Sequence, residues 1–259
     1  MHLGIAGRKA LLCASNAGLG LACAKALAIE GVDVVINGRN PDKIASAIAE
    51  LETVATGNIY SVQADVTSDD GRKALMEACP DPDILLNNNA GPKPKRFMET
   101  ERQDWEETYQ ANYLAPILLV HAVLPGMIDR GFGRIINITS AMVTTPRPHH
   151  TMSAGARAGL TASLKALSFE VAPHNITINN LLPERIDSPR QIEMAKAAMK
   201  REGMTFDEAR AAQVQSIAAK RLGRLDEFGA MFAFLCSEHA GYISGSNMHI
   251  DGGSYPGLV

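Results

Sequence analysis

The sequence has little cysteine, and its cysteines show no spacing typical of a metal site. The four cysteines, at positions 13, 23, 79 and 236, form no Cys-x-x-Cys pair. We therefore expect small buried hydrophobic side chains in a reducing compartment. Charge of one sign is not in excess either, since the formal net charge is −3. This balance argues against nucleic acid or an anionic membrane as the main partner.

Long hydrophobic runs are missing as well. No continuous apolar stretch has the length that a membrane-spanning helix needs, and no signal-peptide pattern precedes the first expected strand. Linkers, internal repeats and low-complexity tracts are also absent, so the 259 residues are interpreted as one domain, 1–259. These absences lead us to expect a single-domain cytoplasmic protein without a membrane segment.

What the sequence does contain is a glycine turn between a strand and a helix. An apolar strand over 8–12 leads into the turn 13–20, a helix follows over 21–30, and a β-branched strand over 32–36. Such a βαβ unit brings backbone N–H groups and the positive end of a helix to one spot, which suits a pyrophosphate. Gly18 and Gly20 stand where a side chain would block phosphate approach or helix–strand packing.

Strands and helices alternate along the rest of the chain. Further strands are expected at 59–64, 84–86, 134–140, 176–183 and 248–251, and long helices at 105–130 and 153–171. This alternation predicts an α/β fold, a Rossmann-type doubly wound parallel sheet with helices on both faces. Ligands bind such sheets beyond the carboxyl ends of the strands. The polar segment at about 184–224 is expected to form a lid over that edge.

Several short motifs follow the expected strands in a fixed order. They are Ala17-Gly18-Leu19-Gly20, Asp65-Val66, Asn88-Asn89-Ala90-Gly91, Asn112, Ile138-Thr139-Ser140, Asn179-Asn180-Leu181-Leu182-Pro183 and Ile250-Asp251-Gly252-Gly253. With them the chain resembles the short-chain dehydrogenase/reductase family, especially its 3-oxoacyl-carrier-protein reductase branch, over nearly its whole length. The resemblance implies a nicotinamide dinucleotide, a small carbonyl or alcohol substrate, and a homo-tetramer or homo-dimer formed through the two long helices.

The resemblance also implies which residues hold the dinucleotide. They are Ser15, Asn16, Gly18, Leu19, Gly20, Arg39, Asp65, Val66, Asn89, Ala90, Gly91, Arg157, Pro183 and Ile186. No acid stands at positions 37 or 38 to bind the ribose 2′-hydroxyl of NAD, whereas Arg39 suits the 2′-phosphate of NADP. NADP is therefore favoured; NAD is the alternative, with Arg39 as a surface turn residue. The family's turn opens Thr-Gly, and Ala14, which replaces that glycine, fits if its φ stays negative.

The family's active site combines Ser, Asn, Tyr and a Lys four residues after the Tyr. Asn112 and Ser140 stand at their places. Counting forward from Ser140 and backward from the strand at 176 both arrive at Ser153, with Arg157 one helical turn later. A rival register gives His150 and Ala154 but requires an insertion. We therefore expect Ser153 and Arg157 to replace the Tyr and the Lys.

This replacement changes the chemistry that the site can perform. A serine hydroxyl is a much weaker acid than a phenol, and an arginine cannot donate a proton near neutral pH because its pKa exceeds about 12. His150, on the loop before this helix, is either a solvated side chain or a substitute acid. The first hypothesis is an NAD(P)-dependent oxidoreductase with an atypical active site. The second is a dinucleotide-binding protein without turnover, a sensor or an assembly subunit.

The charges of the expected lid also allow two interpretations. Its arginines are Arg185, Arg190, Arg201, Arg221 and Arg224. Solvated helix faces explain most charges of this kind, and that interpretation is preferred. The alternative is that they attract an anionic substrate. No metal site is predicted.

Overall fold

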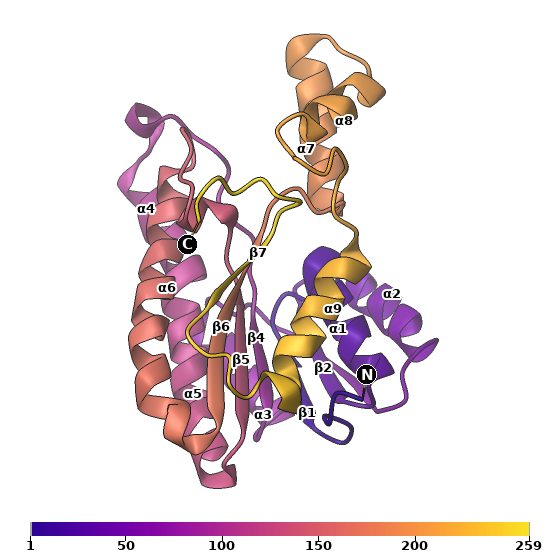
Figure 1. Ribbon diagram of the computed structural model, residues 1–259, viewed down its shortest axis with the longest axis vertical. Coiled ribbons are helices and arrows are strands. Elements are labelled where there is room, and N and C mark those ends of the chain that lie inside the picture. Colours follow the sequence, from indigo (N-terminus) through magenta and orange to yellow (C-terminus); the bar gives the residue numbers. More distant parts are fainter. Residues whose placement is uncertain (1, 259) are drawn as a thin grey trace.

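A parallel β-sheet forms the centre of the computed structural model, which describes residues 2–258 (Figure 1). Over these residues seven strands pair in the order β3-β2-β1-β4-β5-β6-β7. Their bounds are β1 (Lys9–Leu12), β2 (Asp33–Gly38), β3 (Ile59–Gln63), β4 (Ile84–Asn87), β5 (Gly133–Ile138), β6 (Ile176–Pro183) and β7 (Asn247–Ile250). The predicted doubly wound parallel sheet is confirmed.

Helices cover both faces of this sheet. They are α1 (Gly18–Ile29), α2 (Pro41–Glu52), α3 (Asp69–Ala78), α4 (Arg102–Tyr109), α5 (Ala115–Arg130), α6 (Thr151–Val171), α7 (Pro189–Glu202), α8 (Phe206–Val214) and α9 (Leu225–Cys236). One core packs α1, α2 and α9 against the sheet, and a second packs α3, α5 and α6 against the other face (Figure 1). Because both faces are covered, β4 and β5 are buried at every position.

Residues 102–130 form one long helical segment, in which a π-helical turn over Gln110–Leu114 joins α4 to α5. By length and composition alone this segment could cross a membrane, which corrects the expectation that the chain has no run of that kind. The sequence argument missed it because polar residues such as Asn112 and His121 interrupt the continuous apolar run, while the helical segment continues through them. The apolar side chains Leu119, Val120 and Val123 pack into the core beside α6.

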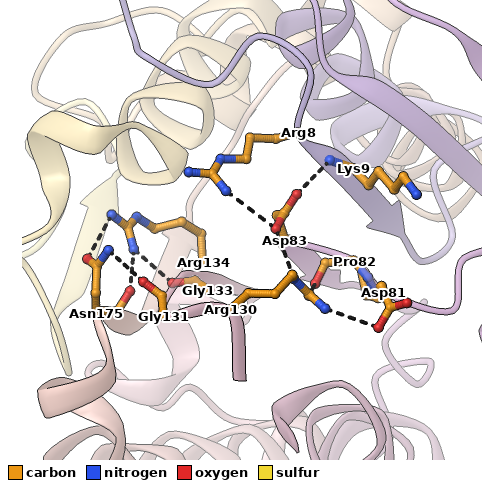
Figure 2. A network of polar contacts seen from close by, with 10 residues as sticks. All are labelled: Arg8, Lys9, Asp81, Pro82, Asp83, Arg130, Gly131, Gly133, Arg134 and Asn175. Carbon is orange, nitrogen blue, oxygen red and sulfur yellow. Dashed lines mark hydrogen bonds and ion pairs between the residues drawn. The ribbon is translucent and has the colours of Figure 1, made fainter. Parts of the chain in front are cut away.

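The amino ends of the central strands are held by a charged network (Figure 2). Asp83 accepts a hydrogen bond from the Lys9 N–H at 3.1 Å and pairs with Arg8 at 3.6 Å and Arg130 at 3.4 Å. Arg134 is buried and donates to the carbonyl of Asn175 at 2.9 Å, and burial lowers the pKa of its guanidinium. The network fixes the edge of the sheet opposite to the strand ends where ligands are expected.

At the carboxyl edge, the segment that contains α7 and α8 stands beyond the strand ends (Figure 1). Ala195 is the buried residue of α7, and the Gln213 side chain of α8 donates to the Gln191 carbonyl of α7 at 2.8 Å. The two helices thus pair with each other above the sheet. This is the place at which the sequence predicted a lid.

Candidate functional site

The turn between β1 and α1 is held by Asn37 of β2. Asn37 Oδ1 accepts a hydrogen bond from the Ala14 N–H at 3.1 Å, and the Asn37 carbonyl accepts one from the Ser15 N–H at 2.8 Å. The Ser15 hydroxyl donates to the Leu12 carbonyl at 2.7 Å and accepts from the Asn37 N–H at 3.1 Å. Ser15 is fully buried, so it shapes the turn from within instead of presenting its hydroxyl to a ligand.

Ala14 has a φ of +43°. The prediction from the sequence that an alanine fits this position with a negative φ is wrong. The left-handed region costs an L-residue roughly 1–2 kcal/mol. Hydrogen bonds on both sides hold Ala14 there, because its carbonyl also accepts from Asn88 Nδ2 at 2.9 Å. The turn keeps the backbone of a glycine although it carries a methyl group.

The two glycines of the turn have different structural roles. A Cβ added to Gly20 would lie 2.5 Å from the Ala14 carbonyl oxygen, so α1 reaches its position against the turn because residue 20 has no side chain. Gly18 has a φ of +57°, and its added Cβ would lie 3.7 Å from Cδ of Pro189. The first residue of α7 therefore borders the glycine turn.

A cleft of about 460 Å³ lies beside the turn at the carboxyl end of β2. It is lined by Ala14, Asn16, Asn37, Gly38, Arg39, Asn40, Pro41, Lys43, Ala64, Asp65, Val66, Asn89 and Ala90. A side chain at Gly38 would overlap the amide of Asn16. The Arg39 side chain is 73% exposed and pairs with Asp65 at 3.4 Å. Arg39 and Lys43 thus bring two cations to a cleft in which Asp65 is the carboxylate.

The strap after β4, Asn89–Ala90, is held from two helices. Asn112, in the π-helical turn, donates through Nδ2 to the Ala90 carbonyl at 3.3 Å. Arg157 of α6 donates through Nη2 to the Asn89 carbonyl at 3.3 Å and through Nη1 to the Ile138 carbonyl at 2.8 Å. Asn112 Oδ1 is buried and has no hydrogen-bond partner within residues 2–258. A buried oxygen of this kind is a place for an ordered water.

Arg157 is a buried cation without a carboxylate partner in the part of the chain that the structure describes. Its residue is 7% exposed, and its hydrogen bonds go to backbone carbonyls. Burial lowers the pKa of the guanidinium to about 10, because removal from water disfavours the charged form. An uncompensated positive charge here favours an anion or a polarised oxygen beside it.

Ser153 and Arg157 approach the same point of the strap. A Cβ added to Gly91 would lie 3.5 Å from Arg157 Nη2 and 4.0 Å from Ser153 Oγ. The two residues therefore line one side of the strap end, as their spacing of one helical turn predicts.

Ser140 and His150 lie on the loop between β5 and α6. The Ser140 hydroxyl oxygen accepts from the Met142 N–H at 3.2 Å, and this leaves its proton to donate. His150 immediately precedes α6, and its Nδ1 lies 3.0 Å from the Pro148 carbonyl. Because a carbonyl only accepts, Nδ1 carries a proton in this arrangement, and Nε2 is the nitrogen that can exchange one.

Several predicted cofactor residues lie away from the cleft. Ile186 is 4% exposed in the core and pairs with Gly223 in an isolated parallel bridge. Leu19 packs against the same core. Pro183 is the last residue of β6.

Sequence reasoning missed a charged cluster at the end of β6. Glu184 is 7% exposed, and its Oε1 accepts from Arg147 Nη1 at 2.9 Å and from Arg185 Nε at 3.2 Å. Arg147 comes from the loop after Ser140, whereas Arg185 follows Glu184 directly with a left-handed φ of +57°. The sequence signal that could have revealed this cluster is the acidic Glu184 directly after Pro183, the proline that ends a buried strand.

The other titratable groups form no metal site. No group of three or more His, Cys, Asp or Glu side chains that could hold a metal ion occurs between residues 2 and 258. All four cysteines are buried and unbridged, as predicted. Burial raises the pKa of Cys13 to about 12 and that of Cys79 to about 11, so both thiols stay protonated near neutral pH.

Known proteins share this architecture along the whole chain. A family model described as enoyl-(acyl carrier protein) reductase matches residues 13–255. The 3-oxoacyl-(acyl-carrier-protein) reductase of Haemophilus influenzae is 32% identical over 96% of this chain and 98% of its own. The NADPH-dependent reductase BacG of Bacillus subtilis is 31% identical over 95% of this chain and 97% of its own.

Solved structures agree with the sequence relatives. The L-sorbose reductase of Gluconobacter frateurii, in complex with NADPH and L-sorbose, superposes with a TM-score of 0.95 at 30% identity and covers 100% of both chains.

Proposed function

The chain belongs to the short-chain dehydrogenase/reductase family of oxidoreductases, and we propose that it binds NADPH and transfers a hydride between the nicotinamide and a carbonyl or alcohol carbon. The proposal rests chiefly on two hydrogen bonds to the strap: Asn112 donates to the Ala90 carbonyl, and Arg157 donates to the Asn89 carbonyl. These bonds preserve a shaped strap beside the glycine turn although the active-site Tyr and Lys of the family are replaced.

The residues around the cleft fit the dinucleotide. The turn at Gly18 and Gly20 leaves room for a pyrophosphate at the start of α1. Arg39 and Lys43 line the cleft at the end of β2, where a 2′-phosphate would lie, and Gly38 offers no acid for a 2′-hydroxyl. The structure of the sorbose reductase contains bound NADPH, and the Bacillus reductase is described as NADPH-dependent. NADP is therefore favoured over NAD for this chain.

When bound, the dinucleotide supplies or accepts the hydride. Ser140 donates a hydrogen bond to the substrate oxygen and polarises the carbonyl, since its hydroxyl proton is left free when its oxygen accepts from the Met142 N–H. Asn112 holds a relay water through the buried Oδ1 that lacks a protein partner within residues 2–258. Ser140 and Asn112 thus keep the polarising and relay parts of the family's site.

Arg157 and Ser153 take over the remaining positions. Arg157 uses one donor of each Nη on the backbone and keeps three further N–H groups for ribose hydroxyls. Its positive charge also stabilises an oxyanion. The proton for that oxyanion comes through Ser153 or from His150 Nε2, since His150 Nδ1 is bound to the Pro148 carbonyl.

Assembly and location follow the family. The outer surfaces of α5 and α6 expose Leu118 and Phe169, whose exposed fractions are 37% and 70%. A surface of this kind is expected to be covered by further copies of the chain, and the proposed assembly is a homo-tetramer or homo-dimer. We place the protein in the cytoplasm, with its four thiols reduced.

Binding and turnover together test the proposal. Calorimetric titration with NADPH and NADH is followed by a screen of ketones and alcohols with the nucleotide that binds. Micromolar NADPH binding with hydride transfer to at least one carbonyl supports the proposal. Tight binding with no turnover on any substrate favours the second candidate, a dinucleotide-binding protein without dehydrogenase activity. What supports that candidate is the sequence register, in which Ser153 stands where the family has its phenolic acid.

A further inference from the structure

Glu184, Arg147 and Arg185 lie beside the place where the proposed function puts the reacting carbonyl. In the sheet Ile138, the last residue of β5, pairs with Leu181 of β6. Ser140 follows Ile138 by two residues, and Pro183, the last residue of β6, follows Leu181 by two. Neighbouring strands lie about 4.8 Å apart. Glu184 is the next residue after Pro183, and Arg147 belongs to the loop that begins at Ser140. The cluster therefore flanks the substrate side of the site.

This cluster carries more positive than negative charge. A single oxygen of the Glu184 carboxylate accepts from both guanidinium groups, and Glu184 has no third basic partner within residues 2–258. One carboxylate balances one of the two arginines. Each guanidinium has five N–H donors and gives one nitrogen to Glu184, so donors of both remain for another acceptor.

Further basic groups surround the same edge. Arg157 adds a second uncompensated charge at the end of β5. The loop after β4 contributes Lys93, Lys95 and Arg96, and its Lys95 N–H donates to the His149 carbonyl at 3.0 Å. Lys95 is balanced by Asp104 at 2.6 Å. Arg147, Arg185 and Arg157 thus outnumber Glu184, the one carboxylate that pairs with any of them within residues 2–258.

Two residues of these loops have a strained backbone. His149 has a φ of +69° and Arg185 a φ of +57°, although neither is a glycine. Such strain costs roughly 1–3 kcal/mol and persists where the surroundings hold it in place. For Arg185 the surroundings are Gly223, whose N–H donates to the Arg185 carbonyl at 3.1 Å, and the carboxylate of Glu184. These two contacts hold the backbone of Arg185 in the left-handed region, with its side chain on Glu184.

We propose that Arg147 and Arg185 bind a carboxylate of the substrate, so that the protein acts on a small keto acid or hydroxy acid. The inference rests on the proposed hydride transfer and adds its substrate class. A guanidinium pair matches the planar carboxylate in shape and charge. A phosphate on a long acyl carrier would lie many bonds from its reacting carbon, whereas these arginines stand one strand from Ser140.

The test compares an acid with its amide in the NADP-loaded protein. Calorimetry with 4-oxopentanoate and 4-oxopentanamide isolates the carboxylate, because the two molecules are nearly the same size. We expect the acid to bind roughly 10- to 100-fold more tightly, the strength of one or two charge-assisted hydrogen bonds. Equal affinities for the acid and the amide would overturn the assignment. Failure to bind NADP at all would instead overturn the proposed function.

Substitutions at three residues separate a ligand site from a structural clamp. Arg185→Gln and Arg147→Gln should each reduce the preference for the acid towards unity, with Arg185→Lys retaining part of it. Glu184→Gln should increase the affinity for the acid at least threefold, because it removes the carboxylate that competes for both guanidiniums. A structural clamp predicts the opposite pattern, in which all three glutamine variants lower the melting temperature and the acid-to-amide ratio stays unchanged.

A second arm distinguishes the source of the anion. Acetoacetyl-coenzyme A carries phosphates far from its ketone, and acetoacetate carries a carboxylate next to it. Turnover of the thioester with no turnover of the acid would mean that Arg147 and Arg185 bind a carrier phosphate. This result would overturn the carboxylate assignment. A lower KM for acetoacetate than for acetoacetamide, lost in Arg185→Gln at similar kcat, would support it.

Discussion

Arg157 Nη1 lies 2.8 Å from the carbonyl oxygen of Ile138, so a side chain of α6 closes the end of β5. The same guanidinium donates to the Asn89 carbonyl after β4. One buried cation thus ties the ends of two central strands together and remains without a carboxylate partner among the described residues. The hold on ribose hydroxyls proposed for Arg157 depends on this charge.

The charge of Arg157 should make NADPH binding depend on pH in the alkaline range. Burial lowers its pKa to about 10, so the cation is fully present at pH 7–8 and is lost as the pH rises from about 9 to 11. NADPH affinity, measured by fluorescence titration, should fall through that window. Arg157→Gln should bind NADPH more weakly at pH 8 and lack the step. A profile that stays flat up to pH 11 would contradict this role for Arg157.

Restoring the family's pair should raise turnover. Ser153→Tyr together with Arg157→Lys supplies a phenolic acid and the cation that lowers its pKa, and positioned acids contribute roughly 10²- to 10⁴-fold. The rate of reduction of simple ketones should increase in the double variant and increase less in Ser153→Tyr alone. If His150 is the acid, His150→Ala abolishes the residual rate. Turnover unaffected by Ser153→Ala and by His150→Ala would refute this placement of the chemistry.

Cofactor preference should depend on Arg39. Arg39→Asp places an acid at the end of β2, where it repels a 2′-phosphate and accepts from a 2′-hydroxyl. We expect the affinity for NADPH to fall roughly 10- to 100-fold and the preference to invert towards NADH, measured by calorimetry. Arg39→Gln is the matched control and should weaken NADPH without gaining NADH. Equal affinities for both nucleotides in the unmutated protein would show that Arg39 is a surface residue.

Assembly should depend on the exposed face of α6. Ala162 is exposed on this helix, in the segment that also carries Phe169. Ala162→Glu places a charge on the proposed contact and should dissociate the oligomer, as measured by light scattering. Ala49→Glu, an equally exposed alanine on α2, is the control and should leave the assembly intact. A monomer at micromolar concentration in the unmutated protein excludes the assembly.

The strain at Ala14 gives a stability prediction. Ala14→Gly removes the Cβ that disfavours a φ of +43°, and the free energy of unfolding should rise by up to about 1 kcal/mol. Ala49→Gly, in the middle of α2, should lower it by about 1 kcal/mol. Urea denaturation of the two variants measures both. A loss of stability in Ala14→Gly would mean that the turn holds alanine without strain.

Local patterns in the sequence were enough to determine the sheet. The β-branched strands, the glycine turn and the helical periodicities each depend on residues close together in the chain, so the doubly wound parallel sheet follows from them. The order β3-β2-β1-β4-β5-β6-β7 is known from the structure. The pairing of Ser153 with Arg157 is likewise one helical turn, and the structure places both beside Gly91.

Tertiary structure alone decided the features that join distant residues. Asn37 holds Ala14 in a left-handed backbone across 23 positions, and Arg147 meets Glu184 across 37. No local pattern encodes such contacts, because they arise when strand ends far apart in sequence meet at one edge of the sheet. For the same reason the burial of Arg157, and with it the lowered pKa of its guanidinium, could be known only from the folded chain.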